Sequence, residues 1–240
     1  MTLDRLRWTT RQRLGARDLT HPILRALARQ DSSWFVGRET DVCIEGYPRS
    51  GNSFAVESFR QANPAARIAH HVHVPSQITR ALSLRIPAAL VIRDPADAVT
   101  SFAIYWGGRI PIGILLGNYI DFHRALEDKL DEIAICPFEL FADRPAYVAK
   151  AVDRRFGTTY AAKAGSMLSE GEGESRARIL SAIESSHVQR FGGDAVRSPA
   201  PTDAKRELKT AVLAELECQP RLEAARTLHK SFLTAVQVPG

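Results

Sequence analysis

Short runs of apolar and β-branched residues alternate with amphipathic stretches over residues 41–157. Four of these runs are typical of β-strands: Asp41–Tyr47, Arg67–Val74, Ala88–Arg93 and Glu132–Phe138. Helical patterns follow them, at Gly51–Ala62, from Pro75, from Pro95 with Asp94 as its N-cap, and over Pro145–Phe156. This alternation predicts an α/β fold, with a central parallel β-sheet flanked by helices and built from right-handed βαβ units.

The length and composition of the chain favour one domain. With 240 residues the chain can form one sizeable core, and is marginal for two. Its 45% apolar and 25% charged residues exclude wholesale disorder and coiled coils. We expect a single domain over 1–240, with a basic helical arm at 1–36, a core at 41–157 and a helical C-terminal part at 172–240. No apolar run reaches the roughly 20 residues of a membrane span, so no transmembrane segment is expected.

The formal net charge of +5 comes from one end of the chain. Residues 1–30 hold seven arginines against Asp4 and Asp18, so the remaining residues balance to zero. A general nucleic-acid-binding surface is therefore not expected. An ordinary solvated helix face is the simpler interpretation of the arm, and contact with acidic lipid, a partner protein or an organellar import receptor is the alternative.

The three cysteines favour a reducing compartment. Cys43, Cys136 and Cys218 are odd in number and have no metal-like spacing, so neither a disulfide framework nor structural zinc is expected. Cys43 and Cys136 lie in strand-like runs and are interpreted as small buried hydrophobes. The sequence therefore predicts a cytoplasmic location.

A strand, a glycine-containing turn and a helix start meet in the segment CIEGYPRSGNSF. This arrangement points backbone N–H groups and a helix dipole at an anion. Compared with the nucleotide-binding pattern G-x-x-x-x-G-K-[ST], Gly46, Gly51 and Ser53 match, whereas Asn52 stands in place of the lysine. Arg49 supplies a cation three positions earlier. The segment therefore suits a phosphate better than triphosphate chemistry, with an ordinary tight turn as the alternative.

Two segments together resemble the sulfotransferases that use 3′-phosphoadenylyl sulfate (PAPS). Tyr47–Phe54 (YPRSGNSF) resembles the family's 5′-phosphosulfate loop. A second signature is an arginine at a strand end and a serine eight positions on, here Arg93 and Ser101. In the family this pair holds the 3′-phosphate, which distinguishes PAPS from ATP. The resemblance spans about residues 40–157 and implies a P-loop NTPase-like sulfotransferase architecture, with 41–157 as the nucleotide-binding core.

Arg93 also has a reason to bind a ligand that is independent of the family. It follows the central strand-like run, and open α/β sheets bind ligands at the carboxyl ends of their strands. A guanidinium can donate two hydrogen bonds to one phosphate. The alternative is that Arg93 pairs with Asp97 while Ser101 only packs.

The resemblance implies further roles. Arg49 would bridge the 5′-phosphate and the transferring group as a catalytic cation. Phe54 stands where the family often has a tryptophan that stacks on adenine, although a core position is the alternative. The family's C-terminal R-K-G-x-x-G loop has no clear counterpart, so Arg190 is the nearest candidate and Arg197 its rival. The 5′-phosphate is expected on the Ser53 hydroxyl and on four backbone amides: those of Ser50, Gly51, Asn52 and Ser53.

The segment HHVHVP offers candidates for the base that sulfuryl transfer needs. In a strand, His71 and His73 would share one face and His70 would take the other. The segment resembles a K-x-H-x-P stretch of the family, which implies His73 as general base with His71 as assistant. A structural or metal-binding histidine pair is the alternative. No third ligand is evident nearby, and the family's chemistry implies no metal.

The predicted function is therefore sulfuryl transfer from PAPS to a hydroxyl or amine, with release of 3′-phosphoadenosine 5′-phosphate (PAP). A P-loop small-molecule kinase using ATP and a non-catalytic nucleotide-binding module are the alternatives. The apolar segment Trp106–Tyr119 either lines an acceptor pocket or belongs to the core. The acceptor class stays wide (a small molecule, a lipid or a saccharide), and the sequence favours no oligomeric state.

Overall fold

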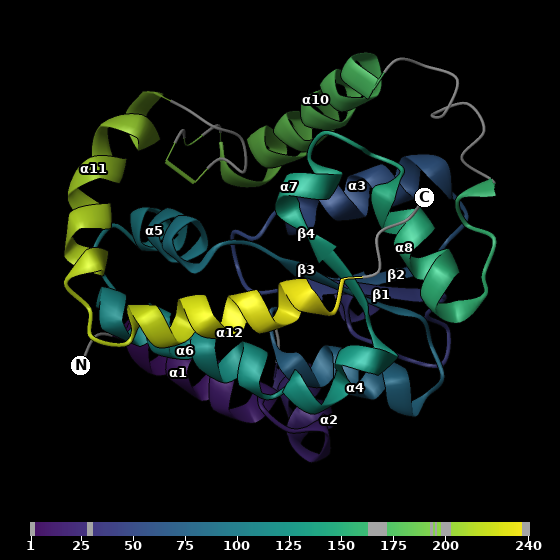
Figure 1. Ribbon diagram of the computed structural model, residues 1–240, viewed down its shortest axis with the longest axis horizontal. Coiled ribbons are helices and arrows are strands. Elements are labelled where there is room, and N and C mark those ends of the chain that lie inside the picture. Colours follow the sequence, from purple (N-terminus) through teal and green to yellow (C-terminus); the bar gives the residue numbers. More distant parts are fainter. Residues whose placement is uncertain are drawn as a thin grey trace.

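A four-stranded parallel sheet lies at the centre of the molecule, with helices on both faces (Figure 1). The computed structural model describes residues 3–27, 31–162, 172–192, 194, 196–197 and 203–236. The strands are β1 (Val42–Gly46), β2 (Ile68–His70), β3 (Ala88–Ile92) and β4 (Ala134–Pro137), in the order β2-β1-β3-β4. The predicted α/β class with a central parallel sheet is confirmed.

The helices form two layers, one on each face of the sheet. One layer holds α3 (Asn52–Ala62), α7 (Phe138–Phe141), α8 (Tyr147–Phe156) and α10 (Glu172–Phe191). The other holds α1 (Leu3–Gly15), α4 (Pro75–Ser83), α5 (Pro95–Trp106), α6 (Ile112–Arg124), α11 (Asp203–Glu217) and α12 (Leu222–Thr234). Helix α2 (His21–Leu27) packs below α1 (Figure 1). Within the described ranges, short 3₁₀ helices also occur: η1 (Asp18–Thr20), η2 (Ser32–Trp34) and η3 (Glu127–Glu132).

Strand β3 shows why its sequence is apolar throughout. Leu90 and Ile92 pack into the layer of α4, α5, α6 and α12, whereas Ala89 and Val91 pack into the layer of α3 and α8. Alternate side chains of a strand point to opposite faces, and here both faces are covered. The sheet therefore has no solvent-facing side at its centre, and ligands can approach it only at a strand end.

The strand order places a topological switch point between β1 and β3. The chain leaves β1 through α3 to pair β2 on one side, then returns through α4 to pair β3 on the other. Gly46 at the end of β1 lies opposite Val91 of β3. Ligands of open α/β sheets bind outside the carboxyl ends at such a point. The loop after β1 and Arg93 after β3 both lie there.

Helix α5 begins as its sequence predicts. The Asp94 side chain accepts hydrogen bonds from the backbone N–H groups of Ala96 (2.8 Å) and Asp97 (3.4 Å), and Pro95 is the first helical residue. The cap satisfies two of the N–H groups that a helix start leaves without intrahelical partners. Because the helix starts directly after β3, it brings Ser101 back toward the switch point.

The second strand is shorter than predicted. It ends at His70, whereas the sequence predicts a strand from Arg67 to Val74. His71 and His73 both have φ of +57°, a left-handed conformation that takes the chain out of the sheet. The prediction that His71 and His73 share a strand face, with His70 on the other, is therefore wrong. The Nδ1 atoms of His70 and His71 lie only 2.7 Å apart.

Several core predictions hold. Cys43 and Cys136 are buried, and burial raises the pKa of the Cys136 thiol to about 12. The apolar segment Trp106–Tyr119 contributes buried residues of α6 to the core, among them Leu115 and Tyr119, and its part in an acceptor pocket stays a prediction. Of the helices that the structure describes, none combines the length and the apolar character needed to cross a membrane.

Candidate functional site

The loop between β1 and α3 is held tightly by its own residues. Gly51 has φ of +96°, and a Cβ atom there would lie 2.6 Å from the Phe138 ring, so glycine is required. The Asn52 side-chain Nδ2 donates to the Tyr47 carbonyl oxygen at 3.0 Å. The residue in place of the usual lysine therefore closes the loop. Arg49 has φ of +67°, an unfavourable backbone conformation for a residue with a Cβ atom.

The loop presents three unused backbone donors. The N–H groups of Gly51, Asn52 and Ser53 have no acceptor among the described residues, because they precede or open the first turn of α3. The predicted fourth donor, the Ser50 N–H, instead donates to the Tyr47 carbonyl at 3.3 Å. The Ser50 hydroxyl is fully buried, and within the described ranges it has no hydrogen-bond partner. Three amides and the positive end of α3 therefore suit an anion.

Arg49, Arg93 and Ser101 meet at the switch point. Arg49 Nε donates to Ser101 Oγ at 3.1 Å, and Arg93 Nη1 donates to the Arg49 carbonyl oxygen at 3.2 Å. Arg93 Nη2 also lies 3.6 Å from Asp97 Oδ2, so the alternative pairing with Asp97 is present as well. Arg93 Nε is buried and has no hydrogen-bond partner among the residues that the structure describes. A buried guanidinium N–H without an acceptor is costly, and an anionic ligand would remove that cost.

Residues of the C-terminal part reach the same place. The Arg49 guanidinium lies 6.0 Å from the centre of the Tyr105 ring, and that of Arg197 lies 5.7 Å from it. Arg197, the rival candidate for the phosphate, therefore lies beside the same aromatic ring as Arg49. The side chain of Arg190 lies outside the described residues, although its backbone belongs to α10.

The pKa shifts reveal how densely the cations are placed. Burial lowers the pKa of the Arg49 guanidinium to about 10, with Tyr105 opposing and Arg93 adding to the shift. Burial and then the charge of Arg49 lower the pKa of the Lys205 amine to about 8. Asp97 is a carboxylate of this region and also accepts from Lys209 at 2.8 Å. Several partly buried cations in one place attract a multiply charged anion.

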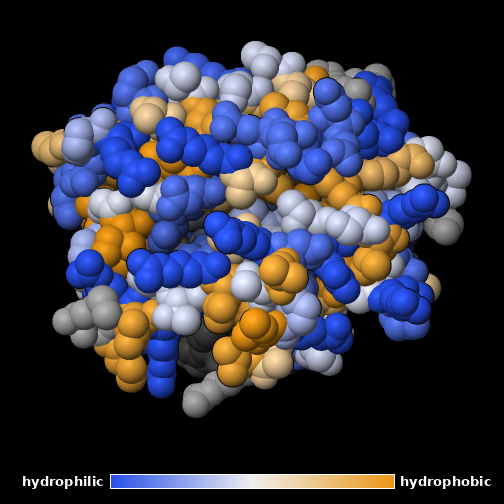
Figure 2. Space-filling model, turned by 90° about the horizontal axis from the view of Figure 1, so that it is seen from below, coloured by the Kyte–Doolittle hydropathy of each residue, from blue (hydrophilic) through white to orange (hydrophobic). Residues whose placement is uncertain are grey.

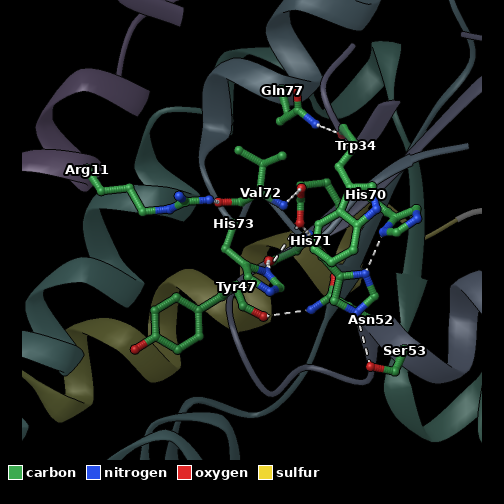
Figure 3. A network of polar contacts seen from close by, with 12 residues as sticks. Arg11, Trp34, Tyr47, Asn52, Ser53, His70, His71, Val72, His73 and Gln77 are labelled. Carbon is green, nitrogen blue, oxygen red and sulfur yellow. Dashed lines mark hydrogen bonds and ion pairs between the residues drawn. The ribbon is translucent and has the colours of Figure 1, made fainter. Parts of the chain in front are cut away.

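The orientation of His73 is set by the end of β1 (Figure 3). Its Nδ1 lies 2.8 Å from the Gly46 carbonyl oxygen and 3.3 Å from Glu45 Oε1. A carbonyl oxygen can only accept a hydrogen bond, so Nδ1 carries the ring proton. The lone pair of neutral His73 is therefore on Nε2, and that atom can accept a proton.

Glu45 is a site residue that sequence reasoning missed. Its carboxylate is fully buried, and it accepts from the N–H groups of Val72 (2.8 Å) and Gly46 (3.1 Å). It thereby fastens the histidine segment to β1. Arg11 of α1 donates to the Val72 carbonyl at 2.7 Å and fastens the same segment from the other side. The signal was a single acid within an apolar strand, because such residues are almost never buried unless paired.

A chain of hydrogen bonds leads to the phosphate loop. Arg60 Nη2 lies 3.4 Å from His70 Nε2, and His70 and His71 share the 2.7 Å contact between their Nδ1 atoms. His71 Nε2 lies 3.0 Å from Ser53 Oγ. Arginine can only donate, so His70 Nε2 accepts and its Nδ1 donates to His71. His71 Nε2 then donates to Ser53, which leaves the Ser53 hydroxyl proton for a ligand. His71 therefore positions Ser53, and its assistance to His73 stays a prediction.

Two further observations concern Phe54 and the histidine pair. Phe54 is 8% exposed and its ring centre lies 6.1 Å from that of Phe141, so it packs in the core, and its stacking on adenine stays a prediction. The rings of His71 and His73 lie 5.6 Å apart. In the part of the chain that the structure describes, no group of three or more His, Cys, Asp or Glu side chains is arranged to hold a metal ion.

The site thus combines three backbone donors, a cluster of cations and an oriented histidine at the carboxyl end of the sheet. In comparisons with known proteins, no family model, curated protein or solved structure matches the chain. The functional conclusion therefore depends on the residues and their geometry.

Proposed function

We propose that the chain is a PAPS-dependent sulfotransferase with a P-loop NTPase-like sulfotransferase architecture. The observation that carries the proposal is the meeting of Arg49, Arg93 and Ser101 beside the free amides at the start of α3. PAPS has anionic groups on both the 5′ and the 3′ oxygen of its ribose. The free amides at the start of α3 form one anion position and the side chains of Arg93 and Ser101 form a second beside it. Two such positions match PAPS better than they match a ligand with a single phosphate.

Each end of the nucleotide has candidate ligands. The N–H groups of Gly51, Asn52 and Ser53, with the oriented Ser53 hydroxyl, would hold the 5′-phosphate. Arg93, whose buried Nε has no protein partner, would hold the 3′-phosphate together with Ser101. Guanidinium groups form paired, charge-assisted hydrogen bonds with phosphate oxygens.

His73 and Arg49 would each assist one part of the sulfuryl transfer. Bound PAPS supplies the sulfuryl group. His73 Nε2 accepts the proton of the acceptor hydroxyl or amine as the new bond to sulfur forms. Arg49 stabilises the negative charge that stays on the 5′-phosphate oxygen as its bond to sulfur breaks. The products are the sulfated acceptor and PAP, with the proton on His73.

The alternatives differ in what the loop must supply. A kinase needs a cation for the terminal phosphates of ATP, and Asn52 instead bonds to the Tyr47 carbonyl. A non-catalytic nucleotide-binding module would not need His73 at all. We keep a small molecule, a lipid or a saccharide as the acceptor class, and a cytoplasmic location on the basis of the three free cysteines.

Thermal unfolding with PAP, ADP and ATP tests the proposal. A ligand at about 100 times its dissociation constant raises the free energy of unfolding by about 2.7 kcal/mol. We expect PAP to stabilise the protein most, and Arg93→Ala to abolish the preference for PAP over ADP. Arg124→Ala, an exposed arginine of α6, is the matched control.

Three results would contradict the proposal. Equal stabilisation by ADP and PAP would remove the second anion position. Turnover of ATP with magnesium, without sulfuryl transfer, would favour the kinase. Failure of labelled PAPS to donate to any acceptor in a panel of alcohols, amines, lipids and saccharides, despite tight PAP binding, would favour a non-catalytic module.

A further inference from the structure

Exposed apolar side chains are concentrated in the arm. Of the eight large apolar residues that are exposed within the described ranges, five lie between residues 3 and 27, and Leu19 reaches 88% exposure. The five are Leu3, Leu6, Leu19, Ile23 and Leu27. Figure 2 views the molecule from the side on which α2 lies in Figure 1, and hydrophobic and hydrophilic residues interleave on this face. We call the exposed residues of 3–27 the arm surface.

The arm surface is also basic. It has four exposed arginines that form no ion pair within the described part of the chain: Arg7, Arg13, Arg17 and Arg25. Both acids of the arm pair with the body of the protein instead, Asp4 with Arg109 at 3.0 Å and Asp18 with Arg80 at 3.8 Å. The two negative charges of the arm are therefore neutralised by arginines of the protein body, and the arm surface keeps a net positive charge.

Helix α1 packs firmly on the body of the protein, so the exposed side chains of the arm have a defined position. Trp8 is buried against Phe102, and its indole Nε1 donates to the Asn118 side chain at 2.7 Å. Gly15 lies so close to Val74 that a Cβ atom on it would come within 2.2 Å of that side chain. The outer face of α1 carries Leu3, Leu6 and three polar or basic residues at helical spacing, while Trp8 faces inward.

We propose that the arm surface docks on an anionic phospholipid bilayer. Arginines attract acidic headgroups, and leucine and isoleucine side chains between them enter the boundary with the acyl chains. Such binding needs both signals, because a few apolar side chains or a few charges alone give weak attachment. The arm surface has both, and the helix α1 that carries part of it is anchored to the body.

Other occupants use only part of this surface. A nucleic acid would pair with the arginines but place five apolar side chains against a phosphate backbone. A second copy of the chain would cover the leucines but bring the arginines of both copies together, and like charges repel. A bilayer interface accommodates both kinds of side chain. The inference concerns binding alone, so it does not depend on the proposed sulfuryl transfer.

Vesicle co-sedimentation of the full chain tests the proposal. We expect binding to phosphatidylcholine vesicles that contain phosphatidylserine, and at least about tenfold weaker binding to phosphatidylcholine alone. Added salt should weaken the binding, because it screens the arginines. Two variants, one that reverses arginine charges and one that removes apolar side chains, should each bind phosphatidylserine-containing vesicles about tenfold more weakly. They are the triple charge reversal R7E/R13E/R17E and the apolar pair L19S/I23S.

Matched controls separate the arm from general surface effects. R124E/R144E reverses two exposed arginines of the body, and L208S removes an exposed leucine of α11, and both should bind as the parent protein does. Thermal unfolding checks that every variant is folded. Equal binding to both vesicle types, or unchanged binding of the arm variants, would overturn the proposal. So would tight binding to duplex DNA without vesicle binding, or a dimer that L19S/I23S dissociates while vesicles are ignored.

Discussion

The Nδ1 atom of His73 lies 2.8 Å from the carbonyl oxygen of Gly46, the last residue of β1. The backbone of the sheet itself thus decides which ring nitrogen carries the proton. Glu45, one residue earlier, lies 3.3 Å from the same atom through Oε1. A strand end therefore presents the Nε2 lone pair of His73, while the next loop presents donors for an anion.

Replacing His73 tests its role as base. We expect His73→Gln to lower kcat by about 10²–10⁴-fold, because general acid–base catalysis contributes on that order. PAP affinity should stay unchanged, since His73 contacts β1 and not the phosphate loop. His187→Gln, on α10, is the control and should keep the parent rate. A fully active His73→Gln variant would exclude the role, and titration calorimetry with PAP would show whether binding survives.

Glu45→Gln tests the fastening of the histidine segment. The change removes a buried carboxylate that accepts from two backbone N–H groups. Hydrogen bonds to charged groups contribute about 1.5–3 kcal/mol, so we expect the free energy of unfolding to fall by that order. We also expect kcat to fall with PAP affinity preserved. Chemical denaturation and steady-state kinetics measure the two effects.

Glu39→Gln is the matched control for that variant. Glu39 is exposed and pairs with Arg67, and exposed ion pairs contribute about 0–1 kcal/mol. We expect little change in stability and none in kcat. Equal losses for Glu39→Gln and Glu45→Gln would show that the buried carboxylate has no special part in holding His73.

The direction of the hydrogen-bond chain can be tested by a double-mutant cycle. His71 Nε2 donates to Ser53 and frees the serine hydroxyl for the phosphate. We expect Ser53→Ala and His71→Ala each to weaken PAP binding about 3–10-fold, the worth of one hydrogen bond. The double variant should bind about as weakly as Ser53→Ala alone. Calorimetric titration measures all four affinities, and strictly additive losses would contradict the coupling.

Lys205 makes PAP binding depend on pH. Burial and the charge of Arg49 lower the pKa of the Lys205 amine to about 8, so the amine loses its proton as the pH rises through that value. The protonated form attracts phosphate, so affinity should fall above about pH 8 and binding should take up protons there. In Lys205→Met this proton uptake should vanish. Calorimetry in two buffers of different ionisation enthalpy measures it, and an unchanged uptake in the variant would exclude Lys205.

The local parts of the fold follow from sequence. The apolar run of β3 and the Asp94–Pro95 start of α5 predict both elements, because an N-cap and a buried strand are short-range signals. The strand–loop–helix around Gly51 follows from glycine and serine spacing in the same way. Because Arg93 directly follows β3 and Ser101 lies in α5, their position near the carboxyl end of β3 follows from the same local signals.

Long-range and left-handed features do not follow from sequence. Lys205 approaches Arg49, and Arg197 approaches the Tyr105 ring, only because the C-terminal helices pack on α5. No local pattern encodes that packing. The alternation in HVHV imitates a strand, yet the strand ends at His70 because the next residues turn left-handed. The alternation of apolar and polar side chains contains no information on the sign of the backbone angle φ.

Backbone conformation at the site has a consequence for evolving this protein. Of the described residues other than glycine, four have positive φ, and three border the site: Arg49, His71 and His73. Such residues cost about 1–3 kcal/mol each. Glycine would relax the chain at each position but would delete a guanidinium or an imidazole. Selection for heat resistance alone would therefore favour glycine at these three positions and yield robust proteins that no longer turn over substrate.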